Sequence, residues 1–488
     1  MKILSFSLLS FLTIVSLFAQ GYEISITLNS RNDTVVLGHY FANRSTMRSD
    51  ALTVLKNGKV VFSGDQKLPK GHYFIYNDGG RVFFDVIIGD NQKFAIVADT
   101  TDLLNRVQFT NSPDNDAFYK FHRYNFESNQ KRQQLNEQFQ NATSDAEKNS
   151  IRTRSMELNN ERLEFIEKLA DGNSNLYVGK FLRALIPIET HLPEPPKDAD
   201  GNVTDPEFLR RWYRAHFFDN LNIFDPDMLR LHFYEDKLLE YFTRAVPPYP
   251  DSICVEVDKI LTKAQANDEM FRCVLVSIFN HYVSSKVIAH ENVWVHVADK
   301  WYIPFAKWSA DDYIEKLRKE VADNKPVLIG HLAPPIEKLM VLPPEHFKAA
   351  ALDTAIKFDV HAGKEIRDFR KELKSKYTVL FFWDYSCGHC KQSIKELLSA
   401  WEELKDEGLQ VITIQIVNTR EAKGKWIDLV NENNMLGWVN AWAPYTWEHR
   451  ELYVGAKGVP RMFLLDENST IILKNIGPEQ LKDIIAKK

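Results

Sequence analysis

Two cysteines separated by two residues carry the clearest chemical signal in this sequence. They stand in Cys387-Gly388-His389-Cys390, and this spacing lets two thiols close a short disulfide ring. The thiolate is the reactive form of cysteine, and the unpaired N–H groups at a helix N-terminus favour it. If a helix begins here, Cys387 is the reactive thiol and Cys390 lies about one turn further on. Such a dithiol can be oxidised and reduced in turn.

The flanking sequence predicts the two elements that would position this dithiol. Val379–Trp383 is a continuous apolar run of strand length, which is typical of a buried parallel strand. Ile394, Leu397 and Leu398 then follow at helical spacing. We therefore expect the dithiol at the turn from a buried strand into a helix.

The remainder of the C-terminal part alternates between helical and strand patterns. The expected elements are a helix over Lys364–Lys374, strand Thr378–Trp383, helix Cys387–Leu404, strand Leu409–Val417, helix Lys425–Asn433, strands Met462–Leu465 and Thr470–Lys474, and helix Pro478–Lys487. A βαβ half followed by a β-hairpin and a last helix predicts an α/β domain with a mixed sheet.

The chain before this domain divides by pattern into three parts. Residues 1–20, with Lys2 ahead of an apolar stretch, have the pattern of an export signal peptide; a retained membrane anchor is the less favoured alternative because the stretch is short. Residues 21–112 alternate and carry turn signals, which predicts a β-sandwich-like domain. Residues 113–340 have helical periods, with a proline-rich linker near 191–204.

Composition limits the classes of partner. The chain has 488 residues, of which 26% are charged and 44% hydrophobic, as in a globular protein of several domains. A formal charge of −5 gives no electrostatic reason to expect nucleic acid as a partner. No later stretch is apolar enough to cross a bilayer, so no stable membrane insertion is expected after signal cleavage. The histidines lack tight ligand spacing, and neither a metal nor another cofactor is expected.

Two further cysteines lie outside the dithiol. Cys254 and Cys273 stand in apolar, helix-like contexts. A structural disulfide between them and two buried free thiols both remain open, and we favour the free thiols.

The dithiol sequence also supports a family resemblance. Phe382–Lys391 resembles the active site of thioredoxin-fold proteins, and Lys457–Asp466 resembles the loop that places a cis-proline beside that site. The domain over 345–488 resembles the exported TlpA/ResA-like thiol–disulfide oxidoreductases. With its accessory segments, the chain resembles multidomain periplasmic thioredoxin proteins of Bacteroidota.

The resemblance and the chemistry together imply roles for individual residues. Cys387 is expected to be the nucleophile and Cys390 the resolving cysteine of a redox-active disulfide, and His389 is expected to stabilise the Cys387 thiolate. Val459 and Pro460, in the cis-proline loop, and Trp383 are expected to contact the substrate.

Two positions depart from the thioredoxin pattern. Ser386 stands where a tryptophan often precedes the first cysteine, and Phe381 stands where thioredoxin has a buried acid. Proton transfer during resolution is therefore not assigned to any residue.

The resulting hypothesis is an exported oxidoreductase of the periplasm or cell envelope. It would exchange disulfides with protein thiols or disulfides and draw electrons from a membrane thiol–disulfide donor, with the reductase direction slightly favoured. Gly388-His389, the dipeptide of protein disulfide isomerases, makes an isomerase or oxidase the first alternative. A peroxidase, which would need a lone peroxidatic cysteine, and a non-catalytic envelope binding protein with a redox-sensing dithiol are the others.

Overall fold

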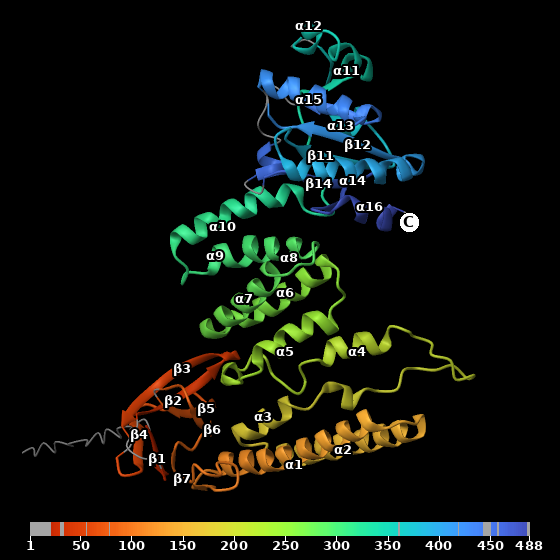
Figure 1. Ribbon diagram of the computed structural model, residues 1–488. Helices are drawn as coiled ribbons and strands as arrows, with labels where there is room; N and C mark the ends of the chain where they lie inside the picture. Colours follow the sequence, from red (N-terminus) through yellow and green to blue (C-terminus); the bar gives the residue numbers. More distant parts are fainter. Residues whose placement is uncertain are drawn as a thin grey trace, which may run out of the picture. The chain divides into compact units, whose positions relative to one another are not determined.

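The chain folds into two compact units. The computed structural model describes residues 21–29, 34–54, 56–77, 79–359, 362–417, 419–442, 450–455 and 458–485, so the expected signal peptide lies outside the described residues. Unit 1 comprises the chain up to Pro247 together with Thr262–Val274 (Figure 1). Unit 2 comprises Pro248–Leu261 and the chain from Leu275 onward.

Unit 1 opens with two four-stranded sheets, ordered β4-β1-β7-β8 and β3-β2-β5-β6. In β1, Ile24 and Ile26 are buried while Ser25 between them is partly exposed, as the alternation of the sequence predicts. The predicted β-sandwich-like domain is therefore confirmed. Its strands are β1 (Tyr22–Leu28), β2 (Thr34–Phe41), β3 (Asn43–Val54), β4 (Lys59–Gly64), β5 (Gly71–Asn77), β6 (Val82–Ile88), β7 (Lys93–Ala98) and β8 (Val107–Thr110).

Helices follow these strands in unit 1. The long helices α1 and α2 pack against each other, and Ser144 and Glu147 cap the start of α2 reciprocally in a capping box. The helical prediction for the middle region is confirmed here. These helices are α1 (Pro113–Asn141), α2 (Asp145–Asp171), α3 (Tyr177–Ala184), α4 (Phe208–His216) and α5 (Tyr234–Glu240), with the short 3₁₀ helix η2 (Pro226–Arg230) before α5.

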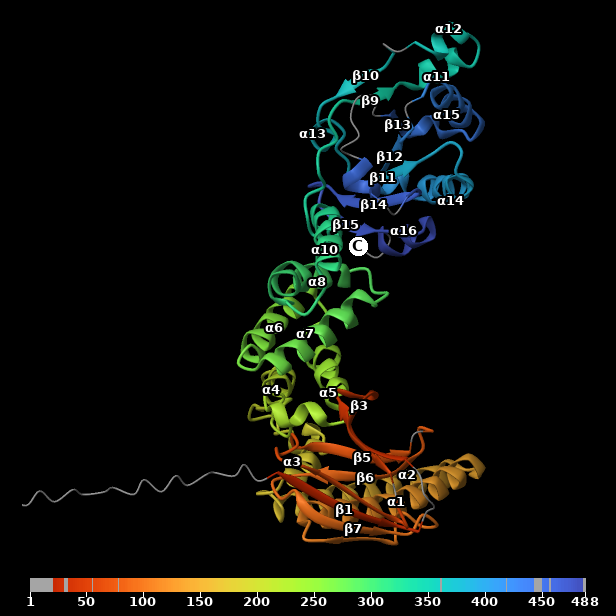
Figure 2. The same cartoon turned by 90° about the vertical axis from the view of Figure 1, so that its left-hand side faces the viewer.

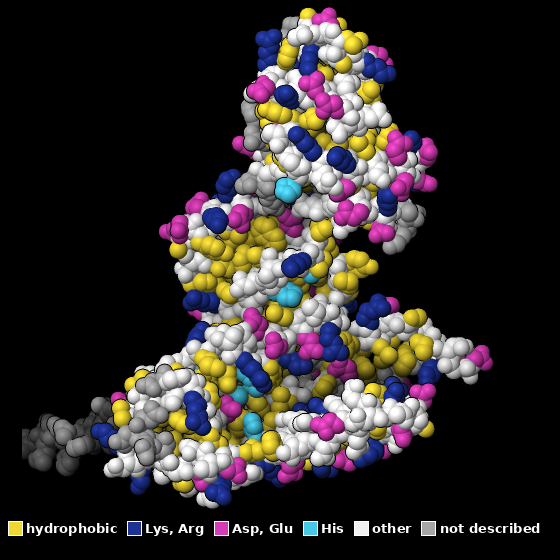
Figure 3. Space-filling model, in the orientation of Figure 1, with side chains coloured by type: hydrophobic (Ala, Val, Ile, Leu, Met, Phe, Trp, Pro, Cys, Tyr) yellow, Lys and Arg dark blue, Asp and Glu magenta, His cyan; other side chains and the backbone are white. Residues whose placement is uncertain are grey.

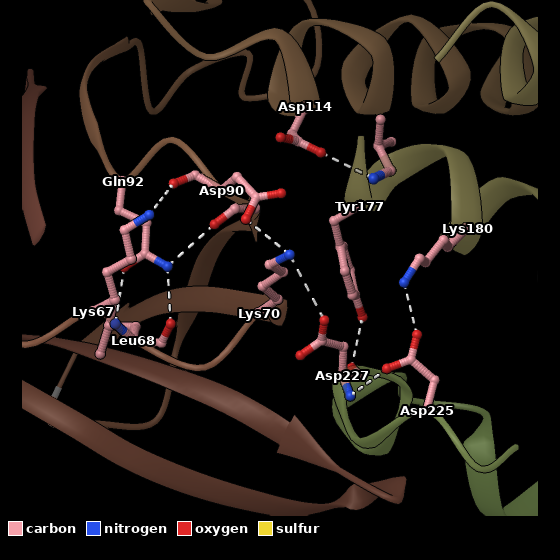
Figure 4. A network of polar contacts seen from close by, with 12 residues as sticks. Lys67, Leu68, Lys70, Asp90, Gln92, Asp114, Tyr177, Lys180, Asp225 and Asp227 are labelled. Atoms are coloured by element: carbon pink, nitrogen blue, oxygen red, sulfur yellow. Dashed lines mark hydrogen bonds and ion pairs between the residues drawn. The ribbon is translucent and has the colours of Figure 1, made fainter. Parts of the chain in front are cut away.

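A network of polar contacts joins the strands of unit 1 to its helices (Figure 4). Lys70 Nζ lies 2.8 Å from Asp90 Oδ1 and 3.8 Å from Asp227 Oδ2, so one lysine connects the β part with η2. At the start of α1, the Asp114 carboxylate accepts a hydrogen bond of 2.9 Å from the Val178 N–H, and burial raises the pKa of Asp114. The β part and the helices thus form one packed body.

Further helices precede the strand that leads into the dithiol. Helices α6 (Pro250–Ala264) and α7 (Asp268–Val283) contribute residues to both units. Unit 2 continues with α8 (His290–Val297), α9 (Ile303–Phe305), α10 (Asp311–Asn324), α11 (Pro344–Ala350) and α12 (Thr354–Lys357).

The sheet of unit 2 has seven strands in the order β10-β9-β13-β12-β11-β14-β15 (Figure 2). Strand β11 pairs in parallel with β12 and antiparallel with β14, and β12 pairs in parallel with β13. This is the mixed sheet that the βαβ-plus-hairpin order predicts. Its elements are β9 (Leu339–Leu342), β10 (Lys364–Ile366), α13 (Phe369–Glu372), β11 (Tyr377–Trp383), α14 (Gly388–Leu404), β12 (Leu409–Gln415), α15 (Arg420–Glu432), β13 (Val439–Trp442), β14 (Arg461–Asp466), β15 (Ile471–Lys474) and α16 (Pro478–Ile485), with the π-helical turn η8 (Arg450–Val454) before β14.

The two faces of this sheet have separate cores. On one face, Val379 and Phe381 of β11 pack with Ile394 and Leu397 of α14. On the other face, Phe382 stacks on Tyr453, with ring centroids 4.9 Å apart. Strand β11 is therefore buried from both sides, which explains why its sequence is uniformly apolar.

Three expectations for unit 2 differ from the structure. The predicted helix over Lys364–Lys374 is wrong, because β10 pairs with β9, buries Ile366, and is followed by a single helical turn that Asp368 caps. Strand β9 lies in this sheet although the expected helical region ran to residue 340, and β13 was not anticipated. Helix α15 begins five residues before the expected start at Lys425, since Thr419 caps it.

The distribution of surface charge and the apolar character of the helices relate to two classes of partner, nucleic acid and membrane. Basic and acidic side chains are interspersed on the face shown in Figure 3, which fits the weak net charge. Across the described ranges, no helix combines the length and the apolar character that spanning a membrane requires.

Candidate active site

The dithiol lies where β11 leads into α14. All seven residues of β11 are buried, and the strand is held between β12 and β14. The three residues Asp384-Tyr385-Ser386 then connect the strand to Cys387, which is the N-cap of α14. The predicted strand-to-helix placement of the dithiol is confirmed.

Asp384 organises the turn that carries Cys387. Its carboxylate Oδ1 accepts hydrogen bonds from the Ser386 backbone N–H at 2.8 Å and from the Ser386 hydroxyl at 2.9 Å. Its carbonyl oxygen accepts a hydrogen bond of 3.1 Å from the Cys387 N–H. Asp384 therefore fixes the backbone immediately before the first cysteine.

The Cys387 sulfur caps the helix. Its Sγ accepts a hydrogen bond of 3.2 Å from the Cys390 backbone N–H, one of the N–H groups that have no partner within the helix. On its other side, the Cys387 thiol donates to the carbonyl oxygen of Val459 at 3.7 Å. The Val459–Pro460 peptide bond is cis, and the predicted cis-proline loop thus lies beside Cys387.

The second thiol has a different environment. Cys390 is fully buried, whereas Cys387 is partly exposed. Burial raises the pKa of the Cys390 thiol to about 12, and its hydrogen bond to Cys387 and the charge of Asp384 act in the same direction. The geometry therefore separates an accessible thiol from a protected one.

The first turn of α14 is open to solvent. Gly388 and His389 are both exposed, and a Cβ atom at Gly388 would meet nothing within 4 Å. The imidazole of His389 thus lies between the two cysteines in sequence and at the surface that a second molecule would approach.

Trp383 does not lie where the resemblance implied. Its side chain is fully buried on the face of the sheet that packs against α14, and its indole N–H has no hydrogen-bond partner. Since successive strand side chains alternate between faces and both faces of β11 are covered, Trp383 supports the core rather than the substrate surface. Of the expected substrate contacts, Val459 and Pro460 remain.

The other cysteines, and the histidines whose positions the structure describes, are not grouped into a second site. No disulfide joins Cys254 to Cys273, which is the alternative favoured above, and burial raises the pKa of Cys254 to about 12. Among the residues with a described position, no three His, Cys, Asp or Glu side chains are grouped as a metal site would require.

Two features of this region were missed from sequence. The role of Asp384 could have been found, because an Asp two residues before a Ser is typical of a side-chain-capped turn. The burial of Arg461, directly after Pro460, depends on segments far away in the sequence and left no local signal.

Comparison with protein families gives three matches along the chain. Residues 351–444, which include both cysteines of the dithiol, match the AhpC/TSA family. Residues 22–118 match a domain of unknown function, DUF4369, and residues 127–324 match another, DUF5106. These boundaries follow the β part and the helical part of the chain.

Solved structures with similar folds include several from Bacteroides species. A thioredoxin-like protein from Bacteroides caccae is 17% identical, with 61% of this chain and 97% of that chain covered, at a TM-score of 0.39. The thioredoxin domain of a thiol-disulfide oxidoreductase from Bacteroides vulgatus is 19% identical, with 33% and 97% covered, at a TM-score of 0.25. A thiol:disulfide interchange protein from a Bacteroides species is 18% identical, with 32% and 90% covered, at a TM-score of 0.23.

A comparison with curated proteins found no match. The fold of the C-terminal part is therefore assigned from its own sheet and from the family match. Its mixed sheet, its dithiol at the start of α14 and the cis-proline beside it are those of a thioredoxin-fold domain. This confirms the predicted fold and supports oxidoreductase activity.

Proposed function

We propose that the chain is an exported thiol–disulfide oxidoreductase that exchanges disulfides with proteins through Cys387 and Cys390. The observation that carries this proposal is the asymmetry of the two thiols. Cys387 is partly exposed at the N-terminus of α14, with the Val459 carbonyl beside it, while Cys390 is buried one turn away. Dithiol exchange needs one accessible thiol that attacks the substrate disulfide and a second thiol that then resolves the mixed disulfide.

The reaction follows from this arrangement. The Cys387 thiolate attacks one sulfur of a substrate disulfide, the Cys387–substrate disulfide forms, and the other substrate sulfur leaves as a thiolate that takes up a proton. Cys390 then loses its proton and attacks the Cys387 sulfur, which releases the second substrate thiol and leaves the Cys387–Cys390 disulfide. Two electrons pass to the substrate, and an external dithiol must return them.

The remaining parts of the proposal have separate support. Export to the periplasm or envelope is supported by the signal-like pattern of residues 1–20. A membrane thiol–disulfide donor would supply the reducing electrons outside the cytoplasm. Protein substrates are supported by the exposed first turn of α14 and by the backbone of Val459, which could pair with an extended segment.

The direction of electron flow is tested by the reduction potential of the Cys387/Cys390 couple. Equilibration with glutathione buffers, followed by thiol counting, gives this value. A potential near that of thioredoxin, about −270 mV, supports the reductase, whereas one near that of protein disulfide isomerase, about −180 mV, supports the isomerase or oxidase.

A Cys387→Ser variant separates the enzyme from the binding-protein alternative. Loss of disulfide reduction with an intact fold supports the enzyme, whereas an unchanged cellular function would favour a binding protein with a redox-sensing dithiol. Retention of peroxide reduction in a Cys390→Ala variant would favour the peroxidase.

A further inference from the structure

Unit 2 contains a cavity on the side of its sheet that faces away from α14. It has a volume of about 370 Å³ and lies among α8, α10, η8 and the first residue of β14. This volume is near the lower end of the range for small-molecule sites in proteins. The residues that matter to its chemistry are Arg461, Tyr453, Trp294, Glu320, Asp323 and Glu451.

Arg461 forms the buried part of this cavity. The residue is only 9% exposed, and its Nε donates a long hydrogen bond of 3.4 Å to the Tyr453 carbonyl oxygen. Within the described ranges, neither Nη1 nor Nη2 has a hydrogen-bond partner. Buried arginines are normally paired, since an unpaired guanidinium loses its hydration without compensation. The described residues of the cavity, Glu291 included, therefore give the Nη atoms of Arg461 no hydrogen-bonded anion.

Glu291, which also lines the cavity, already has a cationic partner. Glu291, whose side chain is 12% exposed, forms an ion pair with Lys474, which is fully buried. Lys474 also donates to the carbonyl oxygen of Val327 at 2.9 Å. Glu291 acts on Arg461 only through its charge, without a hydrogen bond.

The outer part of the cavity has the opposite charge. Glu320 and Glu451 are exposed, whereas Asp323, whose side chain is 35% exposed, forms an ion pair of 3.0 Å with Lys319. Trp294 is partly exposed beside them, and an indole face attracts an ammonium group. The site thus combines a basic floor with an acidic rim.

We propose that this cavity binds a small zwitterion, such as a basic amino acid or a dipeptide, with its carboxylate on Arg461 and its ammonium group at the acidic rim. A guanidinium can hold a carboxylate through two parallel hydrogen bonds. This site goes beyond disulfide exchange, and its test requires no turnover.

The probe for this site is 6-aminohexanoate, which carries a carboxylate and an ammonium group at opposite ends. Calorimetric titration of the full chain should show binding, and hexanoate or hexylamine, each lacking one charged end, should bind at least about tenfold more weakly. The absence of binding at about 10 mM 6-aminohexanoate, or equal binding of all three compounds, would overturn the proposal.

Variants that replace a single carboxylate with a neutral amide test where the ammonium group binds. Glu320→Gln should weaken binding of 6-aminohexanoate several-fold while leaving that of hexanoate unchanged. Glu315→Gln, which makes the same change at an exposed position of α10, should leave both unchanged. Equal effects of the two variants would contradict the proposal.

Arg461→Gln tests the floor of the cavity. Binding should be lost in a variant whose circular dichroism is that of the parent, and retained binding would contradict the assignment. If Arg461→Gln does not fold, the comparison of Glu320→Gln with Glu315→Gln still tests whether 6-aminohexanoate binds in this cavity.

Discussion

The thiol of Cys387 lies 3.7 Å from the carbonyl oxygen of Val459, across a separation of 72 residues in the sequence. Strand β11 positions Cys387, and β14, which starts directly after Pro460, positions Val459. Because these strands are hydrogen-bonded neighbours, the sheet itself brings the dithiol and the cis-proline loop together. In this arrangement Cys387 is accessible to a second molecule, whereas Cys390 is buried.

Alkylation should distinguish the two cysteines of the dithiol. In the reduced native protein near neutral pH, iodoacetamide should modify Cys387 first, because Cys390 is buried and its pKa is raised to about 12. Cys254, whose pKa is also raised to about 12, should react as slowly as Cys390. Peptide mass spectrometry measures each site, and Cys387→Ser should remove the fast reaction. Equal rates at Cys387 and Cys390 would contradict the assigned roles.

Replacing His389 should make the dithiol more reducing. We expect the His389 side chain to stabilise the reduced form of the dithiol relative to the disulfide, so His389→Ala should lower the reduction potential by about 30 mV or more. His331→Ala, at another exposed position of unit 2, provides the control and should leave the potential unchanged. A higher potential in His389→Ala would refute the role of His389.

A histidine pair in unit 1 should make its stability depend on pH. His232 Nδ1 lies 2.9 Å from His72 Nδ1, and its Nε2 lies 3.3 Å from an Arg44 Nη atom. Arginine can only donate, so His232 donates through Nδ1 to His72, whose Nε2 then carries the proton that faces Asp85 at 3.2 Å. His232 is thus neutral in this arrangement.

Burial lowers the pKa of His232 to about 3, with further contributions from His72 and Arg44, although Asp85 acts in the opposite direction. His122 nearby, in α1, also has its pKa lowered by burial. The unfolded chain, in which histidine has a pKa near 6.5, binds more protons between about pH 6.5 and 3. Stability is therefore complete above this window and falls as the pH decreases through it.

The expected slope is up to about 1.4 kcal/mol per pH unit for one such histidine. Urea unfolding of unit 1, followed across this window, should show a shallower slope in His232→Gln than in the parent chain. His191→Gln, at an exposed position, should keep the parent slope. A parent-like slope in His232→Gln would rule out this residue as the source.

The buried ion pair of unit 2 gives a stability prediction. Lys474 of β15 and Glu291 of α8 are both largely removed from solvent, so Lys474→Met removes the cation that forms the ion pair with the Glu291 carboxylate. This change should cost about 3–5 kcal/mol in unfolding free energy, and adding Glu291→Gln should restore part of the loss. A double-mutant cycle by chemical denaturation measures the coupling free energy between Lys474 and Glu291. Additive effects of the two substitutions would contradict the predicted coupling.

The part of the fold that could be predicted from sequence is the part with strong local patterns. The apolar run Val379–Trp383, the cysteine spacing and the helical spacing after Cys390 together located the dithiol. Strand β10 has three residues and no measurable period, so its pairing with β9 overrode the local helical pattern. Trp383 was misassigned because only the packed sheet shows that both sides of β11 are covered.

The most direct test of dithiol exchange is to trap its intermediate. A Cys390→Ala variant, incubated with a disulfide-linked model peptide and then acid-quenched, should gain the mass of one peptide half at Cys387, because no second thiol resolves the mixed disulfide. The Cys387→Ser variant should gain no such mass, and the parent chain should end as the Cys387–Cys390 disulfide. Absence of the adduct in Cys390→Ala, or its appearance in Cys387→Ser, would contradict Cys387 as the nucleophile of a thiol–disulfide oxidoreductase.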